Sequence, residues 1–179
     1  MITGPTAAGK TAAAVAIAQE YGATIVSMDA MQVYRGMDIG TAKVDAETRE
    51  RIPHRCIDIR DPNEDFSAAD FVNEANAAIE SGHPVILCGG TPFYLRAFLL
   101  GLVPAPIVDL EIRRQFEVLE NPHAVLHTVD PILASRLHPN DKVRIIRGLE
   151  FHAASGQRLS EMHDADPKTR RDCEVVWID

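Results

Sequence analysis

The 179-residue sequence contains no apolar run of membrane length, and its N-terminus lacks the layout of a secretory signal. Cysteine is scarce too: Cys56, Cys88 and Cys173 lie far apart and form no CxxC pair. This pattern excludes a disulfide-stapled secreted domain and favours free thiols in a reducing compartment. These absences predict a cytoplasmic protein that has no membrane partner.

Positive charge is in deficit. The chain has 18 Lys and Arg against 26 Asp and Glu, for a net charge of −8. That balance excludes a protein that coats nucleic acid with its whole surface, although a local basic patch stays compatible with it. Hydrophobic residues make up 46% of the chain, so a proper core can form. The length suits one domain, or one domain with a small insertion.

What the chain does contain is the pattern G-x-x-x-x-G-K-[ST] of a phosphate-binding loop. Glycines at both ends let successive backbone N–H groups point into one anion-sized hollow, and the lysine adds a positive charge. The threonine hydroxyl is a predicted Mg²⁺ ligand. A tight Gly/Ala-rich connection before an Ala-rich helix is the alternative. The motif predicts a site for a diphosphate or a nucleotide such as ATP, formed by Gly4, Pro5, Thr6, Ala7, Ala8, Gly9, Lys10 and Thr11.

Strand and helix patterns alternate through the first hundred residues. Such alternation predicts an α/β fold, a doubly wound parallel sheet of the P-loop NTPase-like class. Tyr21 and Trp177 are expected in the core. The predicted helices are 11–21, 45–51, 67–81 and 92–101, and the predicted strands are 23–28, 54–59 and 84–88.

A different pattern follows the α/β core, which we place at residues 1–103. Residues 104–109 form a Pro-punctuated linker, and only helical patterns come after it, at 110–120, 122–129, 131–137 and 142–154. We therefore predict a small all-helical insertion at 104–163. Residues 164–179 are expected to return to the core sheet as a strand, with the chain truncated after it.

Asp29 directly follows the predicted strand 23–28. A carboxylate at the carboxyl end of a parallel strand faces the ligand crevice of such folds. A cap on the following turn is the alternative role for this side chain. A long polar loop, residues 30–43, comes next, and loops of this kind often carry function.

Basic residues gather in the predicted helix 142–154, where Arg144 and Arg147 are spaced i and i+3. This stripe could contact phosphates, or it could be a solvated face; Arg113 leaves the same two alternatives open. His123 and His127 have the i, i+4 spacing of a metal pair, but no third ligand stands at a suitable offset. We do not predict zinc.

Several segments together resemble the tRNA dimethylallyltransferase (isopentenyltransferase) family. They cover nearly the whole chain in the family's order, and as a set they are far more specific than a phosphate loop alone. The chain departs from the family pattern at Ala8, Ala30, Val44, Pro92 and Gly148, and it lacks the family's downstream helical region with its further arginine. The matching segments are GPTAAGKT, SMDAMQVYRGMDIGTAK, PHRCIDIRDPNEDFSAADF, VILCGGTPFYLRAFLLGL and VDPILASRLHPNDKVRIIRGLE.

The resemblance implies transfer of a dimethylallyl group from dimethylallyl diphosphate to the exocyclic amine of an adenosine adjacent to the tRNA anticodon. Lys10 and Thr11, with Mg²⁺, would hold the diphosphate, and Asp29 would be the general base. The partners would be the donor, the tRNA anticodon loop and a missing C-terminal segment. By the same likeness the tRNA contacts would be Asp29, Ala30, Met31, Gln32, Thr91, Arg113, Val143, Arg144, Ile145, Ile146 and Arg147.

Three other interpretations remain. An adenylate isopentenyltransferase would use a free nucleotide as acceptor, but DAMQVYRGMDIGTAK and HPNDKVRIIR are segments of the tRNA type. A small P-loop kinase would need an arginine-rich lid over ATP, and the sequence shows no clear one. An inactive binding fragment would keep the ligand pocket and little else.

Overall fold

The computed structural model describes residues 1–102, 106, 110–165 and 171–179. The chain divides into two compact units, which we call unit 1 (Met1–Leu102 with Thr169–Asp179) and unit 2 (Val103–Lys168). The linker predicted at 104–109 falls, apart from Pro106, outside the described residues. No helix within the described ranges is long and apolar enough to span a membrane.

Unit 1 is built on a parallel sheet of five strands in the order β3-β2-β4-β1-β5. Strand β4 lies between β1 and β2, with Ile86 opposite Ile25 and Cys88 opposite Ile2. Parallel pairing throughout confirms the predicted sheet type. The strands are β1 (Ile2–Thr3), β2 (Thr24–Ser27), β3 (His54–Arg55), β4 (Val85–Cys88) and β5 (Val176–Trp177).

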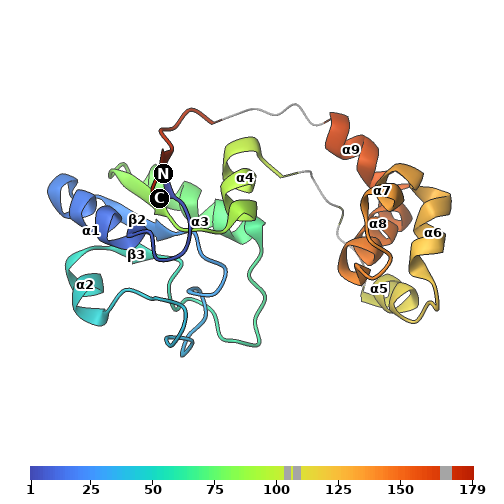
Figure 1. Cartoon of the computed structure of the whole chain (residues 1–179), viewed down its shortest axis with the longest axis horizontal. Helices are drawn as coiled ribbons and strands as arrows, with labels where there is room; N and C mark the ends of the chain where they lie inside the picture. Colours follow the sequence, from blue (N-terminus) through green and yellow to red (C-terminus); the bar gives the residue numbers. More distant parts are fainter. Residues whose placement is uncertain (103–105, 107–109, 166–170) are drawn as a thin grey trace. The chain divides into compact units, whose positions relative to one another are not determined.

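Helices cover both faces of this sheet, as a doubly wound fold requires (Figure 1). Neighbouring residues of a strand point to opposite faces. Val26 therefore joins the cluster with Phe71 and Phe98, while Ile25 joins the cluster with Ala14 and Ala18. The helices of unit 1 are α1 (Lys10–Tyr21), α2 (Ala46–Arg51), α3 (Ala68–Glu80) and α4 (Pro92–Leu100).

Two aromatic residues expected in the core lie on the surface instead. Tyr21 and Trp177 are each 64% exposed. Helix α1 packs on the sheet through the small side chains of Ala14 and Ala18, so its last turn, with Tyr21, extends past the buried contact. Trp177 sits in β5, at the edge of the sheet, and its indole N–H donates to Asp179 close by. The prediction of core positions was wrong for both.

The described residues of unit 2 form helices and no strands. Its core contains Leu126, Leu133, Ile145 and Leu149. Helix α9 was not predicted, because Gly156 ends α8 in the left-handed conformation and only a short helical segment follows. The helices are α5 (Leu110–Glu117), α6 (Pro122–Val129), α7 (Pro131–Arg136), α8 (Lys142–Ser155) and α9 (Leu159–Ala165).

Asp130 links three of these helices. It ends α6, caps α7 by accepting from the Leu133 N–H at 3.0 Å, and accepts from Ser160 of α9 through both N–H (3.0 Å) and Oγ (2.6 Å). Burial alone would raise the pKa of Asp130, but the hydrogen bonds from Ser160 and Leu133 outweigh burial and lower the pKa. A carboxylate with these partners is stable in the charged form inside unit 2.

Candidate active site

Three turns meet at the carboxyl edge of the sheet, because β1, β4 and β2 are adjacent and parallel. They are the phosphate loop after β1, the turn 89–91 after β4, and the turn 29–32 after β2. The Gly89 N–H donates to the Ile2 carbonyl at 3.1 Å, and the Thr91 N–H donates to the Met28 carbonyl at 3.2 Å. Thr91 Oγ1 also accepts from the Ala30 N–H at 3.2 Å. The middle turn is thus hydrogen-bonded to the Asp29 turn and to β1, the strand that leads into the phosphate loop.

The phosphate loop has the backbone shape that the motif predicts. Gly9 (φ 83°) and Ala7 (φ 67°) both adopt the left-handed conformation. Gly9 caps α1 without a side-chain hydrogen bond, so the N–H groups of the first helical turn are left to face an anion. Lys10 Nζ donates to the Pro5 carbonyl at 2.5 Å. This ammonium lies within the loop and can exchange the carbonyl for a phosphate oxygen.

Two glycines of the site are required by close backbone packing. A Cβ on Gly4 (φ 144°) would lie 2.0 Å from the Ile178 carbonyl oxygen, and a Cβ on Gly89 would lie 2.2 Å from the Met28 carbonyl oxygen. Neither position admits a side chain. Sequence reasoning had assigned Gly4 to the anion hollow alone; the structure adds the approach of the segment that follows β5. A Cβ on Gly90 would have 3.5 Å to its nearest neighbour, Gly4 O, and 3.9 Å to Lys10 Nζ.

Asp29 is half-buried and caps the turn that follows it. Its Oδ1 accepts from the Met31 N–H at 2.8 Å and from the Gln32 N–H at 3.3 Å. The capping alternative is therefore present in the structure. Both bonds engage Oδ1, which fixes the carboxylate and leaves Oδ2 as the oxygen that can accept a proton from a substrate.

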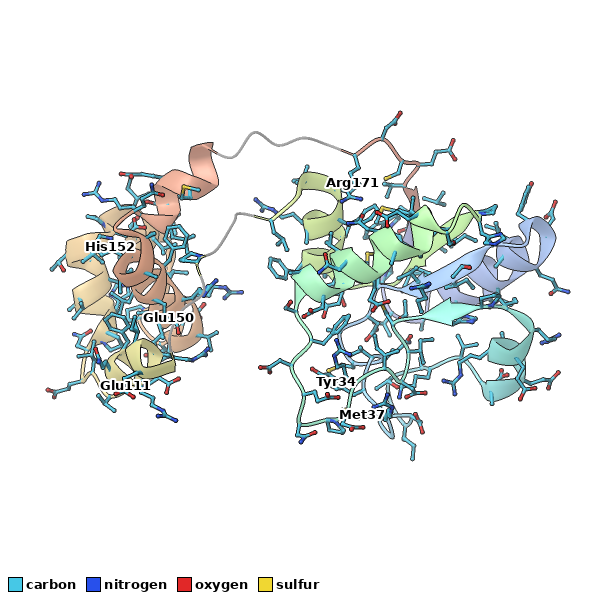
Figure 2. All side chains as sticks on the ribbon, turned by 180° about the vertical axis from the view of Figure 1, so that it is seen from behind. Tyr34, Met37, Glu111, Glu150, His152 and Arg171 are labelled. Carbon is cyan, nitrogen blue, oxygen red and sulfur yellow. The ribbon has the colours of Figure 1, made fainter. Side chains whose placement is uncertain are left out.

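The loop 30–43 is held closed by Gln32, which was expected to contact tRNA, and by Lys43, for which the sequence suggested no role. Gln32 accepts from Ser27 Oγ at 2.8 Å and donates to the Thr41 carbonyl at 2.9 Å. Lys43 is buried and donates to the Tyr34 carbonyl (2.6 Å) and to Asp58 (2.7 Å). Gln32 thus has a structural task, whereas the neighbouring Met31 is 45% exposed. Tyr34 and Met37 mark this loop in Figure 2.

The charge on Lys43 is retained despite its burial. Burial lowers the pKa of Lys43, but its hydrogen bonds to Asp38 (2.8 Å) and Asp58 raise the pKa by more. Asp58 also accepts from Arg49 at 2.6 Å, and Asp58 has a lowered pKa because these two cations outweigh its own burial. The network fixes the loop that begins at the Asp29 turn. Four charged residues between positions 38 and 58 form it, and no spacing rule predicts such a group.

A small cavity of about 20 Å³ lies beside the phosphate loop, lined by Thr11, Ser27, Gln32 and His54 among others. His54 Nδ1 pairs with the Ile52 carbonyl at 2.7 Å, while its Nε2 is buried without a hydrogen-bond partner among the described residues. Burial lowers the pKa of His54, so the ring is neutral near pH 7. The volume is enough for about one water molecule. A larger hollow of about 300 Å³ lies at the other end of α1, away from the loop.

The residues at the phosphate loop would suit a Mg²⁺ ion whose main partners are the phosphate oxygens of a bound diphosphate. Magnesium keeps several waters and binds through one or two protein groups plus phosphate oxygens. Thr11, exposed at the start of α1, is such a group. The described residues contain no group of three His, Cys, Asp or Glu that could hold a metal.

His123 of α6 was considered above for its metal-pair spacing with His127. Its Nε2 pairs with the Ala134 carbonyl at 3.1 Å, which agrees with a structural role for that histidine.

In unit 2, three arginines predicted to contact tRNA are partly exposed at the surface. The side chains of Arg113, Arg144 and Arg147 are 48%, 74% and 45% exposed. Val143 is 73% exposed, whereas Ile145 and Ile146 are 0% and 7% exposed. The two isoleucine side chains therefore lie inside unit 2, and the surface of this segment is formed by its other members.

Comparison with known proteins agrees with these features. A sequence model described as IPP transferase matches residues 32–179. The chain is 50% identical to tRNA dimethylallyltransferase 1 of Citrifermentans bemidjiense, covering 89% of this chain and 54% of that protein. It is 49% identical to the tRNA dimethylallyltransferase of Geobacter metallireducens, covering 92% of this chain and 57% of that protein. The chain thus spans a little over half the length of these relatives.

Solved structures give the same grouping. A eukaryotic dimethylallyltransferase acting on tRNA superposes with a TM-score of 0.86 at 28% identity, over 99% of this chain and 47% of that chain. The tRNA isopentenylpyrophosphate transferase of Staphylococcus epidermidis superposes with a TM-score of 0.57 at 34% identity, over 99% of this chain and 62% of that chain. Since the family model covers most of the sequence, the chain belongs to the IPP transferase family.

Proposed function

We propose that this chain takes part in the transfer of a dimethylallyl group from dimethylallyl diphosphate to the exocyclic amine of an adenosine adjacent to the tRNA anticodon. The observation that carries the proposal is the meeting of three turns at one edge of the sheet, where Thr91 is hydrogen-bonded to the Asp29 turn and Gly89 to β1, the strand that leads into the phosphate loop. Family membership supplies the reaction class. A cytoplasmic location, expected from three separate free cysteines, belongs to the same proposal.

On the donor side, the loop's N–H groups and Lys10 bind the diphosphate. As the allylic C–O bond breaks, these preorganised donors stabilise the negative charge that grows on the leaving oxygen. Mg²⁺ held through Thr11 would neutralise further diphosphate charge. Lys10 supplies its ammonium by giving up the Pro5 carbonyl, so the loop needs only a side-chain movement to receive the donor.

On the acceptor side, Asp29 Oδ2 takes the proton from the exocyclic amine as the new C–N bond forms. An aromatic amine is a poor nucleophile, and a positioned carboxylate base is expected to raise the rate by about 10²–10⁴-fold. The target adenine must leave its stack to reach the base, which a single-stranded anticodon loop permits. The tRNA would be contacted in unit 1 by Thr91 and by the turn of Ala30, Met31 and Gln32. The arginines of unit 2 would add contacts to the tRNA backbone.

The donor is tested by thermal unfolding with Mg²⁺ and either dimethylallyl diphosphate or ATP. A ligand that binds the native state raises the melting temperature by mass action. We expect the allylic diphosphate to raise it and Lys10→Ala to abolish the shift. Stabilisation by ATP and none by the diphosphate would favour the kinase interpretation instead.

The reaction is tested with labelled dimethylallyl diphosphate and three acceptor conditions: tRNA, AMP or none. Because relatives are longer, the assay uses the chain joined to the downstream part of the Citrifermentans bemidjiense protein. We expect label in tRNA, and a rate lower by about two decades or more for Asp29→Asn. The asparagine keeps an Oδ1 acceptor for the turn, so donor binding should survive. Label in AMP would indicate an adenylate isopentenyltransferase, and an unimpaired Asp29→Asn would remove the base from the mechanism.

A further inference from the structure

Glu150 is a buried carboxylate among the exposed arginines of unit 2. It lies on α8 with a side chain only 4% exposed, and it is labelled in Figure 2. Its Oε1 is 3.7 Å from Arg113 Nε of α5, and its Oε2 is 3.5 Å from Arg147 Nη1 of its own helix. One carboxylate therefore lies against two guanidiniums that come from different helices.

The distances suggest that Glu150 orients the two arginine side chains without fully neutralising their charge. Both distances exceed those of tight charge-assisted hydrogen bonds, so each guanidinium keeps N–H groups for another partner. The two arginines are also about half exposed, and they share the two oxygens of one carboxylate. Their shared contact with Glu150 is what points to one phosphate group as a common partner.

Glu117 has the opposite character. It accepts from Arg113 Nε at 3.1 Å, but both side chains are 48% exposed, and the pair is an ordinary i, i+4 surface contact on α5. Exposed pairs of this kind contribute little to stability. An incoming phosphate can displace Glu117 from Arg113, whereas it cannot displace the buried Glu150. Arg113 therefore contacts two carboxylates: the exposed Glu117, which competes with a phosphate for it, and the buried Glu150, which does not.

We propose that Glu150 is a positioning residue, which holds Arg113 and Arg147 together so that they grip one backbone phosphate of an RNA. The inference rests on the proposed function, since it takes RNA as the partner of this face. It adds that a negatively charged side chain promotes RNA binding.

The test compares Glu117→Gln with Glu150→Gln, because the two substitutions should change RNA affinity in opposite directions. Removing a negative charge near RNA should strengthen binding by Coulomb's law alone. We expect Glu117→Gln to do so modestly, and Glu150→Gln to weaken binding by about tenfold because both arginines lose their orientation. Binding of a labelled anticodon stem-loop to the 179-residue chain is measured by fluorescence anisotropy over a salt series. Glu150→Gln binding as tightly as the parent, or more tightly, would overturn the proposal.

The same substitution in a variant that lacks both arginines distinguishes a positioning role of Glu150 from a general loss of folding. In Arg113→Ala/Arg147→Ala, adding Glu150→Gln should weaken RNA binding no further, because its effect passes through these arginines. Further weakening there would indicate general damage to unit 2 and would also overturn the proposal. If the arginine pair itself proves neutral for RNA binding and for its salt slope, the RNA contact of this face fails.

Positioning also has a readout that needs no RNA. The Nε–H proton of Arg113 exchanges with water, and its exchange rate is followed by ¹H–¹⁵N NMR. Because Glu117 also accepts from Nε, the comparison is made in the Glu117→Gln background, where we expect Glu150→Gln to accelerate this exchange in the folded protein. An unchanged rate in a folded variant would contradict the positioning role, whatever the RNA measurements give.

Discussion

The two units present their proposed phosphate-binding groups by different means. In unit 1, the site is formed by backbone: N–H groups at the start of α1, and turns in which Gly4 and Gly89 lie against neighbouring main chain. In unit 2, the proposed RNA-binding groups are long arginine side chains that lie against the buried carboxylate of Glu150. A backbone-built site is sensitive to added atoms, and a side-chain-built site is sensitive to lost charge. Each kind of substitution should therefore damage one unit and spare the other.

The largest effect is expected at Gly89. Alanine there would place Cβ 2.2 Å from the Met28 oxygen and 2.5 Å from its carbonyl carbon, both backbone atoms that cannot step aside. We expect Gly89→Ala to lower the stability of unit 1 by at least about 4 kcal/mol. Hydrogen exchange with mass spectrometry reports on the peptides of each unit separately, and those of unit 2 should keep their protection.

Gly90→Ala is the matched control, since the same methyl group one residue along meets no atom closer than 3.5 Å. Its effect on unfolding should be within about 1 kcal/mol. Equal damage from the two variants would show that the close approach of β4 to β2 is not what requires glycine.

A smaller effect, confined to the other unit, is expected at Asp130. Asp130→Ala leaves the buried N–H groups of Leu133 and Ser160 without acceptors and should lower the stability of unit 2 by about 2–3 kcal/mol. Urea unfolding followed by hydrogen exchange should show α7 and α9 lose protection first. Loss of protection in unit 1 instead would contradict the independence of the two units.

Acid should act in the same place. The folded pKa of Asp130 lies below its ordinary value of 3.8, so its contribution is complete above about pH 4 and is lost as pH falls through the folded pKa. Asp130→Ala should therefore remove part of the acid sensitivity of unit 2. The same acid sensitivity in the variant and the parent would assign this loss to other carboxylates.

The smallest effect is expected at Gly148, in the middle of α8. Alanine would improve helix propensity by about 1 kcal/mol. Its Cβ would however lie 2.7 Å from Leu133 Cδ2 and 3.0 Å from Leu126 Cδ1, which are ends of flexible side chains. Because these can shift, we expect Gly148→Ala to change the free energy of unfolding by less than about 1 kcal/mol. A cost as large as that of Gly89→Ala would show that side chains in unit 2 are as rigid as backbone in unit 1.

Sequence reasoning succeeded where the physics is local. The helix predicted at 67–81 is present as α3, and it begins with a capping box between Ser67 and Asp70, which are only three residues apart. It failed where residues distant in sequence meet. Nothing in the spacing of Lys43 and Asp58 predicts their ion pair, and nothing around Glu150 predicts its burial. The prediction that Trp177 is in the core was wrong because its strand lies at the edge of the sheet. Local sequence patterns do not reveal the order of strands in a sheet.

The chain ends lie side by side in unit 1 (Figure 1). Strand β1 pairs with β5, the terminal ammonium of Met1 donates to the Glu174 carbonyl at 2.6 Å, and Ile178 packs on Gly4. During synthesis the loop 4–11 leaves the ribosome before unit 2, whereas β5, which pairs with β1, follows only after the whole of unit 2. The helical unit is therefore complete, and can fold, before the loop gains its final neighbour. The order of synthesis therefore lets unit 2 form before β5 completes the sheet beside the loop 4–11.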